Sequence, residues 1–126
     1  MALSAYVIPK LLDHVLKGTP FTQPTNIYVS LHTADPGTTG ANECTGGSYA
    51  RQLASSSFAA AGASSKASNA DINFTLMPAA TVTHVGIWDA STVGNFLWGG
   101  ALSASKTVNA GDTFQLPSGQ LTASLT

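Results

Sequence analysis

Charged side chains are scarce in this sequence. Its 126 residues include 5 Lys and Arg and 6 Asp and Glu, for a formal net charge of -1 at pH 7. The charged fraction is 9 %, where about a quarter is typical of soluble domains. So few cations exclude charge-driven binding to nucleic acid, an anionic membrane or an acidic substrate. A surface with so little charge is poorly protected against association, so we expect other chains to cover much of it.

Cysteines and long apolar runs are also missing. Cys44 is the one cysteine, so the chain can form no internal disulfide and no cysteine-rich metal site. No apolar run approaches the roughly 20 residues of a membrane span. The amino terminus, MALSAYVIPKLLDHVLKG, has no basic start, no continuous apolar core and no small-residue cleavage site, so it does not resemble a signal peptide. We therefore expect synthesis in the cytosol and no membrane partner.

The segment 1–18 predicts a short amphipathic helix. Its apolar residues recur at i, i+3, i+4, i+7 and i+8, the spacing of one helix face. They are Ile8, Leu11, Leu12, Val15 and Leu16. Pro9 suits the first turn and Gly18 suits the position after the last turn. An alternative stays open, in which Ser4 caps a longer helix that Pro9 bends.

The segment 26–126 predicts an antiparallel β-sandwich. The run NIYVSLHT alternates apolar and polar residues, which is typical of a half-buried strand. Residues 34–70 are rich in small side chains and predict a long loop region that partners order, although YARQLASSSF could add a strand. Five more runs follow at spacings of about 8 to 12 residues, which favours a sandwich or barrel over βαβ units. They are DINFTLM, TVTHVGIWDA, NFLWGGALS, DTFQLP and QLTASLT.

We expect residues 1–126 to form one mainly β domain, an antiparallel β-sandwich or jelly-roll-like fold with the helix over one end or edge. The turn PSG predicts a hairpin of the last two strands. In the last strand, Leu121, Ala123 and Leu125 share one face. The expected core takes side chains from that strand and from earlier ones. The earlier residues are Ile27, Val29, Leu31, Ile72, Phe74, Val85, Ile87 and Phe114.

Residues 80–100, ATVTHVGIWDASTVGNFLWGG, hold both tryptophans and predict a hairpin. On a regular strand, alternate residues share a face. One face would carry Val82, His84, Gly86 and Trp88, and the other Thr83, Val85, Ile87 and Asp89. On the returning strand, Phe96 and Trp98 would share a face opposite Leu97, and Gly99 and Gly100 would allow a bulge or a close backbone approach. Both tryptophans therefore predict packing in the core or at an interface.

Two groups of residues in and around this hairpin are candidates for chemistry. His84 and Asp89 could act in catalysis, but no nucleophile motif accompanies them and a regular strand places them on opposite faces. The three histidines, His14, His32 and His84, have no metal-binding spacing, so a zinc site would need three distant elements. We expect these histidines to be hydrogen-bonded or solvated.

The remaining candidates also favour structural roles. Asp35 and Glu43 lie in a glycine-containing loop that lacks the alternating oxygen ligands of an EF-hand, so an ordinary turn is expected. Arg51 is expected to pair with a carboxylate. The sequence thus predicts no catalytic, cofactor-binding or metal-binding residues and no enzyme, with a small carbohydrate-active or lysis-related domain as the competing class.

Five stretches carry a resemblance to a known family. They are LLDHVLKGTPFTQPTNIYVSLHTADP, GGSYARQ, MPAATVTHVGIWDA, NFLWGGAL and KTVNAGDTFQLPSGQLTASL. In that order they resemble a family of small tailed-phage proteins, which are often labelled tail fiber proteins. Some similar small β-proteins are capsid cement or decoration subunits. The resemblance covers nearly the whole chain and implies a virion structural protein without catalytic residues.

From this resemblance and the length of the chain, we expect a capsid cement protein that binds across capsomers and stabilises the head. Its partner would be the major capsid protein, and it would form a homo-oligomer, most plausibly a trimer. The alternative is a tail fibre or tail adaptor protein that takes part in host attachment and binds other tail proteins. The sequence has neither the long repeat of a fibre shaft nor a separate receptor-binding domain. Either protein would be made in the host cytoplasm and used on the virion.

Overall fold

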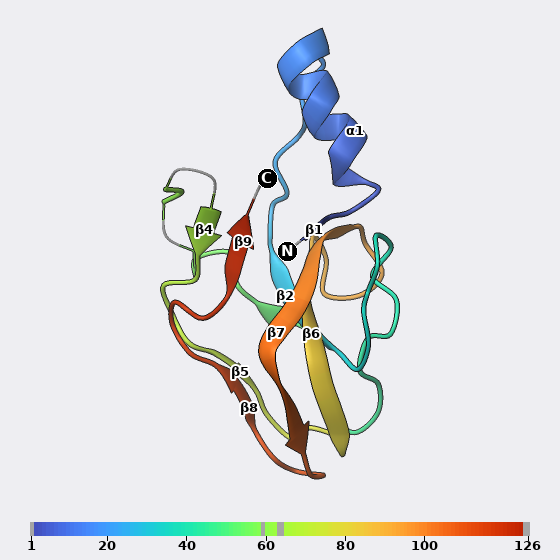
Figure 1. Ribbon diagram of the computed structural model, residues 1–126, viewed down its shortest axis with the longest axis vertical. Coiled ribbons are helices and arrows are strands. Elements are labelled where there is room, and N and C mark those ends of the chain that lie inside the picture. Colours follow the sequence, from blue (N-terminus) through green and yellow to red (C-terminus); the bar gives the residue numbers. More distant parts are fainter. Residues whose placement is uncertain (1, 59, 63–64, 125–126) are drawn as a thin grey trace.

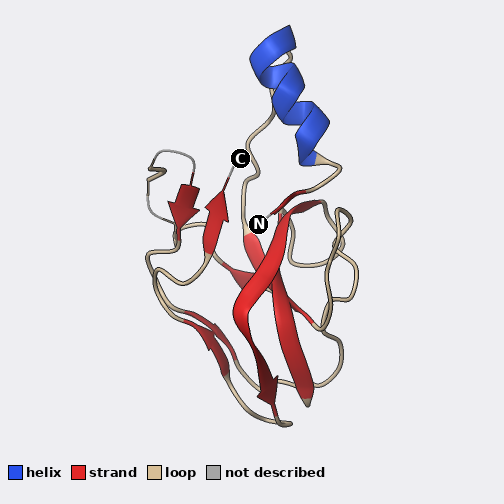
Figure 2. Cartoon of the chain, viewed as in Figure 1, coloured by secondary structure: helices blue, strands red, loops and turns tan. Residues whose placement is uncertain are grey.

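Short antiparallel strands build most of the computed structural model, which describes residues 2–58, 60–62 and 65–124. The strands are β1 (Ala2–Leu3), β2 (Tyr28–His32), β3 (Gln52–Leu53), β4 (Ser65–Ala67), β5 (Ile72–Phe74), β6 (Ala80–Trp88), β7 (Phe96–Val108), β8 (Phe114–Leu116) and β9 (Thr122–Ser124). Five of them form a sheet in the order β1-β7-β6-β2-β3, and two ribbons, β4-β9 and β5-β8, lie beside it (Figure 1). Strands far outweigh helix (Figure 2). The predicted mainly β fold with an amino-terminal helix is confirmed.

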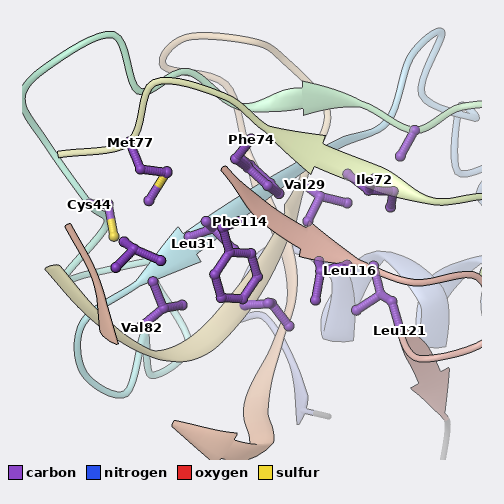
Figure 3. Close-up of a cluster of buried hydrophobic side chains, with 13 residues drawn as sticks. Val29, Leu31, Cys44, Ile72, Phe74, Met77, Val82, Phe114, Leu116 and Leu121 are labelled. Atoms are coloured by element: carbon purple, nitrogen blue, oxygen red, sulfur yellow. The ribbon is translucent and has the colours of Figure 1, made fainter. Parts of the chain in front are cut away.

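The main core fills the space between the sheet and the two ribbons (Figure 3). Phe74 and Phe114 project into it from β5 and β8, and Val29 and Leu31 meet them from β2. All but one of the side chains predicted for the core from residue 27 to residue 114 are buried. The exception is Ile27, which is half-buried against a smaller cluster around Ile87. In the last strand Leu121 is buried and Ala123 is half-buried, while Leu125 lies outside the described residues.

The helix begins later than the sequence indicates. It comprises α1 (Val7–Leu12) and a wider π-helical turn, η1 (Asp13–Lys17), and it ends at Gly18, whose φ is +73°. The prediction of a helix from residue 1 is wrong, because Ala2 and Leu3 pair with β7 as β1. Ser4 lies just before the helix and satisfies its first backbone donors, since its Oγ accepts a hydrogen bond from the Val7 N–H at 3.1 Å and its carbonyl accepts one from the Ile8 N–H at 3.1 Å. This contact agrees with the role of Ser4 in the alternative, but the helix starts at Val7 and is not the longer one that the alternative describes.

The expected position of the helix is also wrong. It projects away from the strands instead of covering an end or an edge of the sheet (Figure 1). Only its base packs on the β-structure, where Val7 is buried with Ile87 and Leu97. Most of the apolar face that the sequence predicts therefore lies exposed.

The last two strands do not form the predicted hairpin. Instead, β8 pairs with β5 and β9 pairs with β4. The turn at residues 117–119 is held by earlier residues, because the Ser118 N–H donates to Asp71 and the Gly119 N–H donates to the Ser68 carbonyl. The run β8-β9 therefore follows the run β4-β5 along its length as a bent antiparallel pair.

Strand β2 is buried on both faces, which corrects the prediction of a half-buried strand. Val29 and Leu31 face the main core, while Ser30 and His32 on the other face are each 0 % exposed. The segment after β2 covers this second face: the His32 ring bonds to the Ala41 carbonyl, and Pro36 is buried. Polar residues at alternate positions of this strand thus mark a covered face and not a solvated one.

Two irregularities in the pairing of β6 with β7 change the predicted faces. Between Val82 and His84 the register shifts, so Val82 joins Val85 in the main core. A second shift pairs Ile87 with Trp98 and Trp88 with Phe96. Phe96 therefore packs against Trp88, while Trp98 packs beside Ile87 in the smaller cluster. The prediction that Phe96 and Trp98 share a face is wrong for this reason.

The region 34–70 is more ordered than the predicted loop. It contributes β3 and β4, and the strand expected within YARQLASSSF is present at Gln52–Leu53. Cys44 and Ala54 are buried in the main core, and the Tyr49 hydroxyl accepts a hydrogen bond from the Leu31 N–H at 2.9 Å. This segment is held by the chain itself, at least as far as residue 54.

Candidate functional site

A chain of hydrogen bonds lies buried between β2, β6 and the segment that follows β2. The Trp88 indole N–H donates to Ser30 Oγ at 2.9 Å, and Ser30 Oγ lies 2.7 Å from His32 Nε2. His32 Nδ1 lies 2.7 Å from the Ala41 carbonyl. A carbonyl can only accept, so Nδ1 carries the proton and Nε2 accepts from the Ser30 hydroxyl. This chain therefore fixes the neutral tautomer of His32.

Gly86 shows how tightly this polar chain is packed. A Cβ at Gly86 would lie 2.7 Å from Ser30 Oγ, 2.8 Å from His32 Nε2 and 2.7 Å from the Phe96 ring. No side chain fits there without moving one of the three groups. The glycine is thus required for the close approach of β6 to the polar chain.

A second polar cluster surrounds Arg51. Its guanidinium forms a two-point ion pair with Glu43, with Nε–Oε1 at 2.9 Å and Nη2–Oε2 at 2.8 Å. The same group lies 3.6 Å from the centre of the Trp88 ring and donates to the carbonyls of Ala90 and Val93. The carboxylate expected for Arg51 is thus Glu43. This cluster connects the segment after β2 to the β6-β7 turn.

Burial alters the acid–base behaviour of both clusters. Desolvation is the main cause that lowers the pKa of His32, and the Ala41 carbonyl opposes it. Desolvation likewise raises the pKa of the Tyr49 hydroxyl well above its usual range, with the Glu43 carboxylate as a further cause. The Tyr49 hydroxyl also donates to Glu43 Oε1 at 3.0 Å. Neutral His32 and neutral Tyr49 are the forms that this interior favours.

The arrangement of Ser30 and His32 resembles a nucleophile and its base, but its setting favours a structural role. A catalytic serine must reach a substrate atom, whereas Ser30 and His32 are 0 % exposed. The Ser30 hydroxyl is occupied by Trp88 on one side and His32 on the other. The chemistry available here is mutual hydrogen bonding, which fixes the segment after β2 against the sheet.

The other candidate residues are separated. Asp89 accepts two hydrogen bonds from Asn95 within the β6-β7 turn, and Asp35 accepts one from the Gly37 N–H, so both serve turns. His84 bonds to Thr83, and His14 accepts from the Phe21 N–H. Within the described residues, no group of three or more His, Cys, Asp or Glu side chains could hold a metal ion.

Cys44 and the helix are the two remaining predicted features. The thiol is buried in the main core, and desolvation raises its pKa, which keeps it in the unreactive protonated form. In the described part of the chain, no helix is long and apolar enough to cross a membrane.

The sequence alone indicates part of one of the two polar clusters. Ser30 and His32 stand two apart on one strand, which places them on the same face. Nothing local links Tyr49 or Glu43 to them, because those contacts join residues far apart along the chain. For the irregular pairing of β6 with β7, the sequence offered one indication, the adjacent Gly99 and Gly100.

The surface differs from this interior in one way that bears on function. Apolar side chains are exposed along the projecting helix, and the exposed fractions are 42 % for Ile8, 54 % for Leu12, 68 % for Val15 and 79 % for Leu16. We call these four residues the helix stripe. Large apolar side chains gathered on one exposed element are typical of a contact surface for another protein.

The internally braced β-fold and the exposed helix stripe define a structural protein that is suited to contact with other chains. A family model described as "Podophage GP4 fiber I protein gp80" matches residues 2–124. The chain belongs to this family and is a virion structural protein of tailed phages. The resemblance drawn from the sequence is confirmed. No curated protein matches the chain.

Proposed function

We propose that the chain is a non-enzymatic subunit of the phage fibre that acts by binding other tail proteins. The observation that carries the proposal is the helix stripe, which is exposed on a helix that projects from the β-structure (Figure 1). The fibre named in the family description supports the same role. The burial of Ser30 and His32 supports a protein that binds and does not catalyse.

Capsid cement, which the sequence favours, is the second candidate. Its support is the low charge of a chain with 9 % charged residues, which suits a small subunit spread over a shell and bound to the major capsid protein. The fibre takes precedence here because the family description names it. In both roles we propose a homo-oligomer, with a trimer as the expected state.

The copy number in purified virions separates the two functions. Quantitative mass spectrometry, with the major capsid protein as the internal standard, should find a handful of copies per particle for a fibre subunit. Hundreds of copies per particle would favour the capsid cement function over the fibre function. Absence from washed virions would contradict both and favour the competing enzymatic class.

Phages that lack the gene give an independent test. A fibre subunit should be needed for adsorption to cells, while the shells keep their normal heat resistance. A cement protein should give the reverse, with normal adsorption and release of DNA at lower temperature. Complementation with the intact gene is the control for both measurements.

A further inference from the structure

The helix stripe needs a cover that the chain does not supply. The helix spans 11 residues, Val7–Lys17, and helices shorter than about 12 to 15 residues are marginal in water unless an apolar face is packed. Val7 packs the base of the helix against the body, the helix projects from the β-structure (Figure 1), and the side chains of the stripe are exposed. The charged residues Lys10, Asp13 and Lys17 are exposed as well.

An apolar groove opens on the body of the same chain. It lies between the sheet and the β4-β9 ribbon, and its volume is about 400 Å³. We call it the ribbon groove. Its apolar lining includes Ile27, Phe58, Ala61, Ile87, Trp98 and Ala123. Several of these residues belong to the smaller packed cluster that also holds Val7 and Leu11 of the helix, so the groove and the helix share one apolar cluster.

One polar group of a residue that lines the ribbon groove has no partner in the described part of the chain. The indole Nε1 of Trp98 is buried and makes no hydrogen bond to any described residue. An unpaired buried donor is unfavourable and indicates a missing acceptor. The last turn of a helix carries such acceptors, because its final carbonyls lack partners within the helix. In this helix, the Asp13 carbonyl accepts from the Gly18 and Thr19 N–H groups, and no described group outside the helix donates to the carbonyls of residues 14–16.

We propose that the helix stripe of one copy packs into the ribbon groove of the next copy of this chain. Each copy then inserts its helix into the groove of one neighbour and receives the helix of another. The apolar stripe packs against the apolar lining of the groove, and the carbonyls of the last helix turn face the Trp98 donor. The net charge of -1 leaves little repulsion between copies. A repeated contact of this head-to-tail kind closes into a ring when the rotation between copies permits it, and a ring of three copies is the trimer that we propose.

The size of the contact argues against helix-on-helix packing alone. At 1.5 Å per residue the helix is about 16 Å long and about 10 Å wide, so its footprint is well below the roughly 800 Å² per partner of a stable interface. The groove enlarges the contact, because its walls surround the inserted side chains. The use of both surfaces by every copy enlarges it again. The inference rests on the proposed homo-oligomer but not on a fibre or shell location.

Paired variants of the purified full chain test this contact between copies by sedimentation velocity at tens of micromolar. We expect wild type to be an oligomer. The double variant Leu12→Gln, Leu16→Gln should lose the stripe, and Ala61→Arg should fill the groove, with association at least tenfold weaker in each. Leu53→Gln is the matched control, because Leu53 is exposed to a similar extent on the sheet edge, and it should assemble like wild type.

Mixing the two defective variants gives the decisive measurement. The stripe variant keeps an intact groove and the groove variant keeps an intact helix, so together they should form a one-to-one heterodimer through one contact. A monomeric wild type, normal assembly of Ala61→Arg, or a mixture that associates no more tightly than either variant alone would each overturn the proposed contact. Circular dichroism verifies folding, and Val15→Gln and Ser65→Arg replace any variant that fails to fold. These results leave the virion copy number unaffected, so the two proposals can fail separately.

Discussion

Removal of the Phe74 ring should cost more stability than most single changes in this chain. The side chain is 1 % exposed in the main core, stacked against Tyr49 with ring centres 6.1 Å apart and edge-on to Phe114 at 6.3 Å. Truncation of a buried phenylalanine to alanine costs about 3 to 5 kcal/mol. Because two aromatic contacts are lost with the ring, Phe74→Ala should fall in the upper half of that range. A domain is stable by only about 5 to 15 kcal/mol in total, so the loss is a large part of it.

Urea unfolding followed by tryptophan fluorescence measures this cost. The midpoint for Phe74→Ala should fall while the slope of the transition stays as in wild type, which shows that stability and not compactness has changed. Phe74→Leu, which keeps most of the apolar volume, should lose less. The exposed-site control Leu53→Ala should change the free energy of unfolding by no more than about 0.5 kcal/mol. A loss below about 1 kcal/mol for Phe74→Ala would show that the ring does not fill the core as described.

Three further predictions concern the buried polar clusters. Gly86→Ala should destabilise the fold by about 1 to 3 kcal/mol, because its new methyl group overlaps Ser30, His32 and Phe96; Gly62→Ala, which meets open space, is the control in urea unfolding and should be near neutral. Glu43→Gln should lower stability by about 2 kcal/mol, less than the 3 to 5 kcal/mol of a fully buried pair, because the Glu43 side chain is 21 % exposed while Arg51 is 8 % exposed; equal stability of the two proteins would rule out a structural ion pair. Burial lowers the pKa of His32 from 6.5, so its contribution should be complete above pH 6.5 and lost as the pH falls through the lower folded-state pKa; a pKa above 6.5 in an NMR titration of this imidazole would contradict the reasoning.

The fold class was predictable because its signals are local. Short runs of apolar and β-branched residues separated by turn residues indicate an antiparallel β-fold whatever their pairing. The same runs predicted most of the core, including Val29, Leu31 and Phe74, because alternation assigns a face to each residue. The helix was predictable from spacing alone. Its position was not, because the pattern that marks an apolar face does not say which chain will cover it.

Strand pairing and register were less predictable for a physical reason. The expected hairpin at PSG fails because Ser68 and Asp71, about 50 residues earlier, hold the turn backbone. The faces of Phe96 and Trp98 changed with one shift of register, since a single extra residue moves every later side chain to the opposite face. The polar clusters depend on similar long-range contacts. Nothing near Arg51 in the sequence indicates that its guanidinium covers Trp88.

The two polar clusters also bear on why the surface carries so little charge. Glu43 and Arg51 belong to the 11 charged residues of the chain, 5 basic and 6 acidic, and they neutralise each other below the surface. Their contacts fix the segment after β2 and the β6-β7 turn, so the charges stabilise the fold at the expense of solubility. The helix stripe exposes further apolar area on a surface already short of charge. Both features are unfavourable for an isolated monomer and become favourable once other chains cover the surface, which is the condition of a subunit within a virion.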